Sequence, residues 1–286
     1  MRTLPRALIA YNGYDSGLGN RVRVVLGAKA LAELENRRLF YVWPTGTLFG
    51  PRFTDLWNFR GHTIPRSVSR AFAPVYPYHD EKLDWINDRE RRRPLWQIRT
   101  GSPLQLPPEA GSWQEEFRGL VPVDAIAARV HKMHANTLGD QPYVGVMIRA
   151  HAVSHRRTVE ASPVEWYVRR MRELQEVEPS TRFFLSCDVE EVQREVMRQI
   201  PNCTAQFDKG GYNSLEGVRS SIVDLYLLAC SGYLLGPHFS SFVHLAEHLA
   251  GDQLTFETSM GRHGEPIDFR AQGVVTDPLV PALRVR

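Results

Sequence analysis

Apolar and polar residues alternate in blocks along the chain, and the blocks predict strands followed by helices. Residues 6–11 form a short apolar run that is typical of a buried strand. A glycine-rich turn follows at residues 12–19, and from 20 to 35 apolar residues recur at helical spacing. The run 38–43 predicts the next strand. Strand, turn, helix and strand in this order form a βαβ unit, so we expect a parallel sheet.

The second half of the chain repeats this alternation more regularly. A polar loop is expected at 149–162, between the first strand and the first helix of this half. The predicted strands are 143–148, 182–186, 233–236 and 254–257, and the predicted helices are 163–177, 190–199, 214–229 and 240–250. Repeated strand–helix alternation predicts a second α/β domain.

The segment between these two regions has a weaker pattern. Residues 45–119 are rich in prolines and aromatics, and we expect them to form the irregular remainder of the first domain, with loops facing the substrate. A helix is predicted over 123–136 and leads to a junction at 139–142. The 286 residues fit roughly two domains. We therefore expect domains at 1–138 and 139–286 that face each other across a cleft, because ligands of open α/β sheets lie beyond the carboxyl ends of the strands.

Composition and charge exclude several classes of protein. Hydrophobic residues make up 43% and charged residues 23%, as in ordinary globular proteins. The net charge is +3, and the densest basic cluster, 89–93, is interpreted as a solvated face or, less favoured, as a patch for an acidic substrate. No broad basic face for nucleic acid is indicated.

Targeting and redox signals are equally sparse. No run approaches the roughly 20 apolar residues that a membrane span needs, and residues 1–10 lack the pattern of a signal peptide. The three cysteines, Cys187, Cys203 and Cys230, do not have the spacing of a zinc site. We expect a cytoplasmic protein with reduced thiols, no membrane span and no metal.

The turn at residues 17–21, Gly-Leu-Gly-Asn-Arg, is the first candidate site. Glycines allow the backbone to approach a ligand, and a helix N-terminus favours an anion or a polar sugar group. Asn20 is also a good helix N-cap, which is the alternative interpretation. The turn lacks the third glycine of a dinucleotide fingerprint and the Gly-Lys-Ser/Thr of a phosphate-binding P-loop.

A second candidate follows the strand 143–148. Arg149 lies at its end, and three arginines and two histidines occur within nine residues there: Arg149, His151, His155, Arg156 and Arg157. Guanidinium groups bind phosphate oxygens in a bidentate manner and keep their charge, so the segment indicates a phosphate site. A structural salt bridge is the alternative for Arg149.

The third candidate is the pair of helices over 214–229 and 240–250. Asp224 lies within an apolar helix, where an unpaired carboxylate is costly, so a base or ribose could supply its donors. Ser240 and Ser241 open the last helix, where hydroxyls and free N–H groups bind phosphate. The alternatives are a salt bridge for Asp224 and a plain N-cap for Ser240.

Together these motifs resemble the fucosyltransferases that use GDP-fucose. Residues 213–224 and 239–241 are similar to the segment ENSLRGVILD…FSS of the α-1,6-fucosyltransferases, and residues 145–150 are similar to their GVHVRR motif. The turn at 17–21 resembles that of the protein O-fucosyltransferases and the rhizobial nodulation fucosyltransferases. The similarity covers most of residues 143–250 and a short N-terminal piece.

The resemblance implies a GT-B fold, two facing Rossmann-like domains, and an inverting transfer of fucose to a hydroxyl of a glycan or small molecule without metal or cofactor. It implies that Arg149 binds the β-phosphate, that Asp224 recognises the guanine, and that Ser240 and Ser241 bind the pyrophosphate. Glu160 matches the glutamate proposed as general base.

We complete this predicted site with neighbouring residues. His155 is the second candidate base and Asp15, beside the glycine turn, is the third. The resemblance implies that Asn20 lines the acceptor side of the cleft. We assign Asp15 and Arg21 to the same side and Gly19 to the donor.

Two positions depart from the family pattern. Met147 replaces a histidine that precedes the arginine by two residues, and Ala150 replaces the second arginine. Arg156 or Arg157 could restore the lost charge. The alternatives are a transferase for a different nucleotide sugar, or a nucleotide- or carbohydrate-binding protein of the same fold with weakened catalysis. A sulfotransferase or kinase is disfavoured because the phosphate loop is missing.

Overall fold

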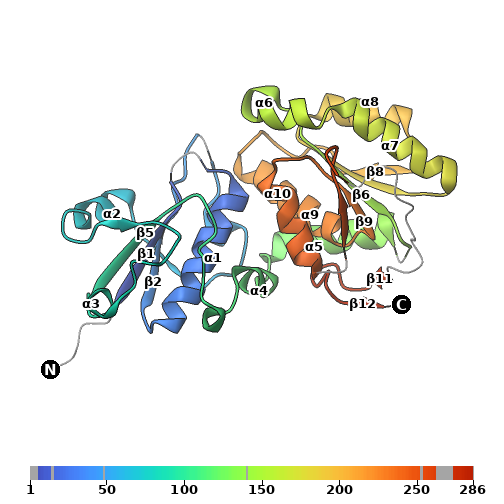
Figure 1. Cartoon of the computed structure of the whole chain (residues 1–286). Helices are drawn as coiled ribbons and strands as arrows, with labels where there is room; N and C mark the ends of the chain where they lie inside the picture. The colour runs from blue at the N-terminus through green and yellow to red at the C-terminus, as the bar shows by residue number, and fades with distance from the viewer. Residues whose placement is uncertain are drawn as a thin grey trace. The chain divides into compact units, whose positions relative to one another are not determined.

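The structure is a computed structural model in which the chain divides into two compact units, Met1–Val121 and Pro122–Arg286. It describes residues 6–13, 16–47, 49–139, 141–251, 254–261 and 273–285, and only the backbone of 152–155. Each unit has its own five-stranded parallel sheet with helices against it (Figure 1). The α/β class expected from the sequence is confirmed.

The first unit has the strand order β3-β2-β1-β5-β4, with all neighbours parallel. Its strands are β1 (Ala7–Tyr11), β2 (Arg38–Val42), β3 (His62–Thr63), β4 (Tyr78–His79) and β5 (Leu95–Arg99), and its helices are α1 (Leu18–Leu34), α2 (Arg66–Phe72), α3 (Asp88–Arg91) and α4 (Trp113–Arg118). α1 packs on β1 and β2 and also on α4. Most residues of α1 are therefore buried, as expected for a helix that packs against more than one neighbour.

The expectation that 45–119 is irregular is wrong, because three of the five strands come from this segment. β3 and β4 have two residues each, too few for any periodicity to be visible in the sequence. β5 is longer, but the polar Gln97 interrupts its centre. Gln97 is fully buried because it accepts a hydrogen bond from Ser69 and donates one to the carbonyl of Tyr76.

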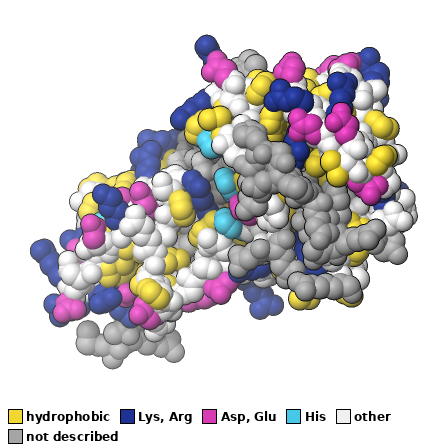
Figure 2. Space-filling view, turned by 45° about the vertical axis from the view of Figure 1, so that its right-hand side comes forward, with side chains coloured by type: hydrophobic (Ala, Val, Ile, Leu, Met, Phe, Trp, Pro, Cys, Tyr) yellow, Lys and Arg dark blue, Asp and Glu magenta, His cyan; other side chains and the backbone are white. Residues whose placement is uncertain are grey.

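The basic cluster at 89–93 lies over α3 and the residues after it, and α3 has no buried residue. Arg91 pairs with Glu35, and Arg93 pairs with Glu90. The interpretation as a solvated face is confirmed. Figure 2 shows basic and acidic side chains interspersed on the visible face of the molecule.

The second unit has the order β10-β9-β6-β7-β8, again fully parallel. From β6 the chain adds β7 and β8 on one side and then β9 and β10 on the other. The point between β6 and β9 is therefore the switch point, where doubly wound sheets bind ligands. The strands are β6 (Val144–Ile148), β7 (Phe183–Cys187), β8 (Cys203–Ala205), β9 (Tyr233–Leu235) and β10 (Thr255–Glu257), the helices are α5 (Asp124–Met133), α6 (Ala152–Ala161), α7 (Val164–Val177), α8 (Glu190–Gln199), α9 (Leu215–Ala229) and α10 (Ser241–Ala250), and a small hairpin pairs β11 (Val274–Val275) with β12 (Arg284–Val285).

In Figure 1, α7 and α8 lie on one face of this sheet, and α9 and α10 lie on the other. The core of the first face is formed by apolar residues of β6, β7 and α7, among them Val146, Leu185 and Met171. Among the described residues, no helix is long and apolar enough to cross a membrane.

Two expectations for this unit differ from the structure. The predicted polar loop at 149–162 contains helix α6, because its Ala, Arg and Glu residues are strong helix formers. The expected boundary at 138/139 lies within the second unit, because α5 packs against α9.

A buried ion pair fastens the edge strand of the second sheet. Nε of Arg170 in α7 donates to both carboxylate oxygens of Glu257 in β10, at 3.0 and 3.1 Å. The Tyr233 hydroxyl donates to the same carboxylate at 2.6 Å. The exposed fractions of the Arg170 and Glu257 side chains are 7% and 0%, so the buried Glu257 carboxylate depends on Arg170 to replace its lost hydration.

Removal of the cation from this pair should destabilise the unit strongly. We expect Arg170→Met to lower the free energy of unfolding by about 3–5 kcal/mol, because Glu257 would remain buried without its cation. The matched control is Arg169→Met, since the Arg169 side chain is 68% exposed. Its effect should stay within about 0.5 kcal/mol. Urea denaturation measures both, and equal effects of the two variants would contradict the prediction.

Candidate functional site

Arg149 lies directly after β6, at the switch point of the second sheet. Its Nη1 donates to Oδ2 of Asp188 at 3.2 Å, and its guanidinium lies 5.3 Å from the centre of the Phe242 ring in α10. The side chain is 17% exposed. Among the described residues no other group accepts from it, so donors remain for a ligand. The salt bridge that was the alternative is thus present, and it leaves Arg149 partly accessible.

Asp188, which follows β7, is the residue that sequence reasoning missed. Oδ1 accepts the backbone N–H groups of Ala150 and His151 at 2.7 and 3.2 Å, while Oδ2 accepts from Arg149. One carboxylate therefore fixes both the turn after β6 and the arginine. Its position directly after a parallel strand, next to the strand that Arg149 follows, was the signal that could have found it.

The N-terminus of α10 lies on the other side of Arg149. Ser240 takes the N-cap position and is buried, but its hydroxyl makes no capping hydrogen bond. The alternative of an N-cap is therefore confirmed in position, but without a hydrogen bond from the side chain. Ser241 is the first residue of the helix and precedes Phe242, whose ring lies near Arg149. The structure brings Arg149, Ser240 and Ser241 to one edge, where the helix N-terminus also favours an anion.

The loop before α10 is held in an unusual conformation. Phe239 has a φ of +63°, a left-handed conformation that is costly for a bulky residue. The ring of Phe239 contacts the guanidinium of Arg157 at 3.9 Å, and the backbone N–H of His238 donates to Ser162 at 2.9 Å. These contacts from the α6 segment stabilise the loop.

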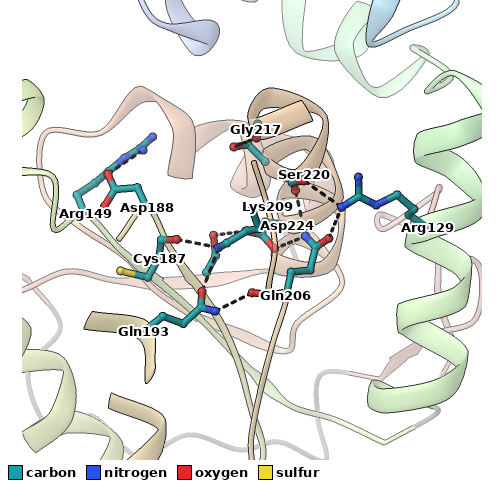
Figure 3. Close-up of polar contacts among 12 residues, drawn as sticks. Arg129, Arg149, Cys187, Asp188, Gln193, Gln206, Lys209, Gly217, Ser220 and Asp224 are labelled. Carbon is teal, nitrogen blue, oxygen red and sulfur yellow. Dashed lines mark hydrogen bonds and ion pairs between the residues drawn. The ribbon is translucent and has the colours of Figure 1, made fainter. Parts of the chain in front are cut away.

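Asp224 lies in α9 behind this edge and is 2% exposed. Its carboxylate accepts a hydrogen bond from Ser186 at 2.8 Å. It also accepts from Gln206 at 2.5 Å and from Lys209 at 3.1 Å (Figure 3). The salt bridge that was the alternative for Asp224 is present, with Lys209 as the cation. The role of Asp224 in recognising guanine stays a prediction.

Two of the candidate bases, Glu160 and His155, belong to α6. The Glu160 carboxylate accepts from Nε of Arg156 at 2.8 Å, one helical turn away, and the two side chains are 62% and 85% exposed. An exposed pair of this kind is weak, so both groups stay available to a ligand. The structure describes only the backbone of His155.

The remaining predicted residues belong to the first unit. α1 begins after Gly17, so Gly19 and Asn20 lie inside the helix and Asn20 is not its N-cap. Arg21 is 2% exposed and donates to the carbonyls of Ser16 and Pro44. Its role at the acceptor stays a prediction, and Asp15 lies outside the described residues.

The two departures from the family pattern also have defined surroundings. Met147 is 2% exposed within β6, and the backbone of Ala150 donates to Asp188. Next to them, the ring of His151 stacks on Tyr212 with the ring centres 4.6 Å apart. No group of three His, Cys, Asp or Glu residues that could bind a metal occurs in the part of the chain that the structure describes.

Solved structures share this architecture. The fucosyltransferase NodZ from Bradyrhizobium gives a TM-score of 0.59 at 16% identity, over 85% of this chain and 93% of that one. A variant of Arabidopsis thaliana FUT1 in complex with GDP gives 0.58 at 12% identity, over 90% and 71%. POFUT1 in complex with GDP-fucose gives 0.54 at 13% identity, over 89% and 98%. No family model and no curated protein matches the chain by sequence.

The fold is that of the GDP-fucose fucosyltransferases. The resemblance indicated by the sequence motifs is confirmed at this level, together with the GT-B class. At 12–16% identity the likeness concerns the fold, and the facing arrangement of the domains and their cleft stay predictions.

The turn before α9 yields a test of the site's framework. A Cβ on Gly217 would overlap the backbone carbonyl of Gly211. We expect Gly217→Ala to lower the free energy of unfolding by about 1–3 kcal/mol, because the backbone must shift. In the control Gly27→Ala, the new Cβ would lie 3.5 Å from Leu104, an ordinary contact within a helix. That variant should be neutral or more stable, and thermal denaturation that ranks the two in the opposite order would refute the prediction.

Proposed function

We propose that this protein is an inverting glycosyltransferase that transfers fucose from GDP-fucose to a hydroxyl of a glycan or small-molecule acceptor. The observation that carries the proposal is the position of Arg149 at the switch point of the second sheet, beside the N-terminus of α10. The fold is shared with proteins solved in complex with GDP and GDP-fucose, which supports the same donor.

In this reaction the acceptor oxygen forms a bond to C1 of fucose while the bond between C1 and the β-phosphate oxygen breaks. Negative charge develops on the departing GDP, and a base takes the acceptor proton. Arg149 and the free N–H groups at the start of α10 would stabilise this charge, because fixed donors aimed at a developing anion lower the barrier. We propose that no divalent metal is needed, since the arginine supplies the positive charge.

A nucleotide- or carbohydrate-binding protein with weakened catalysis is the second candidate. One observation favours it: three protein donors already surround Asp224. Release of free GDP from GDP-fucose, with or without an acceptor, distinguishes the two functions, because a binding protein releases none.

The first functional test concerns the donor phosphate. Arg149→Ala should reduce transfer by about 100-fold or more, as the loss of a group that stabilises transition-state charge does. Arg149→Lys should also be impaired, because it keeps the charge but loses the bidentate geometry. Initial rates of GDP release measure the effect, with the exposed Arg169→Ala as control. Near-normal turnover of Arg149→Ala would refute the assignment.

The second test concerns the base. Glu160→Gln keeps the size of the side chain and removes its basicity, so kcat should fall by about 100-fold while GDP binding survives, as expected for a general base. Glu195→Gln is the control, since it lies in an exposed pair with Arg198 on α8. Normal turnover of Glu160→Gln together with an inactive His155→Ala would assign the base to the histidine.

A further inference from the structure

Lys209, in the segment between β8 and α9, is bound to three different elements. Its ammonium donates to the Cys187 carbonyl at the end of β7 at 2.7 Å, to Gln193 of α8 at 3.0 Å, and to Asp224 of α9 at 3.1 Å. Figure 3 shows the ammonium at the centre of these acceptors. An ammonium has three donors, so its capacity is used within the protein.

The carbonyl that accepts from Lys209 belongs to the residue before Asp188. Three successive residues at this strand end each form a polar contact. Ser186 donates to Asp224, and the Cys187 carbonyl accepts from Lys209. Asp188 accepts from Arg149. Asp188 also accepts from the amides of the turn after β6. A single peptide unit thus connects the acceptor of the lysine to the acceptor of the arginine.

We propose that Lys209 is a positioning residue of the anion site, which fixes the end of β7 so that Asp188 orients Arg149 toward the donor diphosphate. The inference rests on the proposed function for the identity of the anion. Lys209 is 16% exposed and its donors are occupied, so it acts through Cys187 and Asp188 and does not itself contact the phosphate. Asp224 has the matching role of anchoring Lys209 and Ser186.

A charge-based alternative would give Lys209 only a long-range attraction for the anion. The positioning role and the long-range attraction can be distinguished experimentally. Attraction of the anion by the lysine does not require Arg149, whereas positioning acts through Arg149. A double-mutant cycle therefore decides between them.

Calorimetry measures how tightly inorganic pyrophosphate binds to four proteins. These are the full chain, Lys209→Met, Arg149→Ala and the double variant. Lys209→Met should weaken binding by about 10-fold or more, the scale on which residues of one polar network couple. In the Arg149→Ala background it should cause no further loss. Equal losses in both backgrounds, or unchanged binding in Lys209→Met, would overturn the proposal.

Hydrogen exchange supplies a readout that needs no ligand. The Ala150 and His151 amides, which donate to Asp188, should exchange about 10-fold faster in Lys209→Met, because the carboxylate that protects them is no longer fixed. The control is Glu257→Gln, which weakens a different buried ion pair and should leave these amides unchanged. Protected amides in Lys209→Met would also overturn the proposal.

Lys209→Arg keeps a cation beside Asp224. It therefore provides a second test if Lys209→Met does not fold. It should show a smaller loss of pyrophosphate binding than Lys209→Met, and a wild-type affinity with fast amide exchange would contradict the coupling. A native chain that binds no pyrophosphate, while Lys209→Met exchanges faster, would refute the proposed function and leave the positioning of the turn supported.

Discussion

The buried carboxylate of Asp224 is the constraint on which the carboxyl edge of the second sheet depends. A carboxylate removed from water is stable only when donors surround it, and Ser186, Gln206 and Lys209 supply them. These donors come from β7 and from the segment before α9, so their satisfaction determines how these elements meet. A polar network of this kind has one arrangement in which all its groups are paired, and that arrangement gives the edge a defined shape.

The network continues toward α5 through Arg129, whose side chain is partly buried. Arg129 of α5 donates to Gln206 and to Ser220, and it forms an ion pair with Glu216. Since Gln206 also donates to Asp224, α5 is connected to the end of β7 by side-chain hydrogen bonds. This explains why α5 belongs to the second unit, although the weak sequence pattern placed it before the junction.

Much of this organisation could be predicted from the sequence, because it depends on local pattern. The strands β1, β2, β6, β7 and β9 and the long helices were visible as apolar runs or helical spacing. Arg149, Ser240 and Ser241 follow or precede such elements directly, so their meeting at one edge followed from the parallel sheet. The segment of α6 was interpreted as a loop because it is polar and lacks a clear apolar stripe, although its Ala, Arg and Glu residues are strong helix formers.

The rest depends on partners distant in sequence. β3 and β4 have two residues each and are defined by their neighbours in the sheet and not by their own pattern. Asp188 and Lys209 belong to no motif of the sequence, and only the pairing of β7 with β6 places the first beside Arg149. The ion pair of Asp224 was an open alternative, but nothing local identified its cation.

The order of the strands has a consequence for synthesis of the chain. Each sheet is built from one continuous stretch, so the first can be completed before the second has left the ribosome. In the second unit β10 is the last strand of the sheet to be made. Arg170 is therefore synthesised 87 residues before Glu257, the buried carboxylate that neutralises it. Until that strand emerges, Arg170 can pair with Glu173 of its own helix but lacks its buried acceptor, so the α7 face of the sheet closes only when the nascent chain is nearly complete.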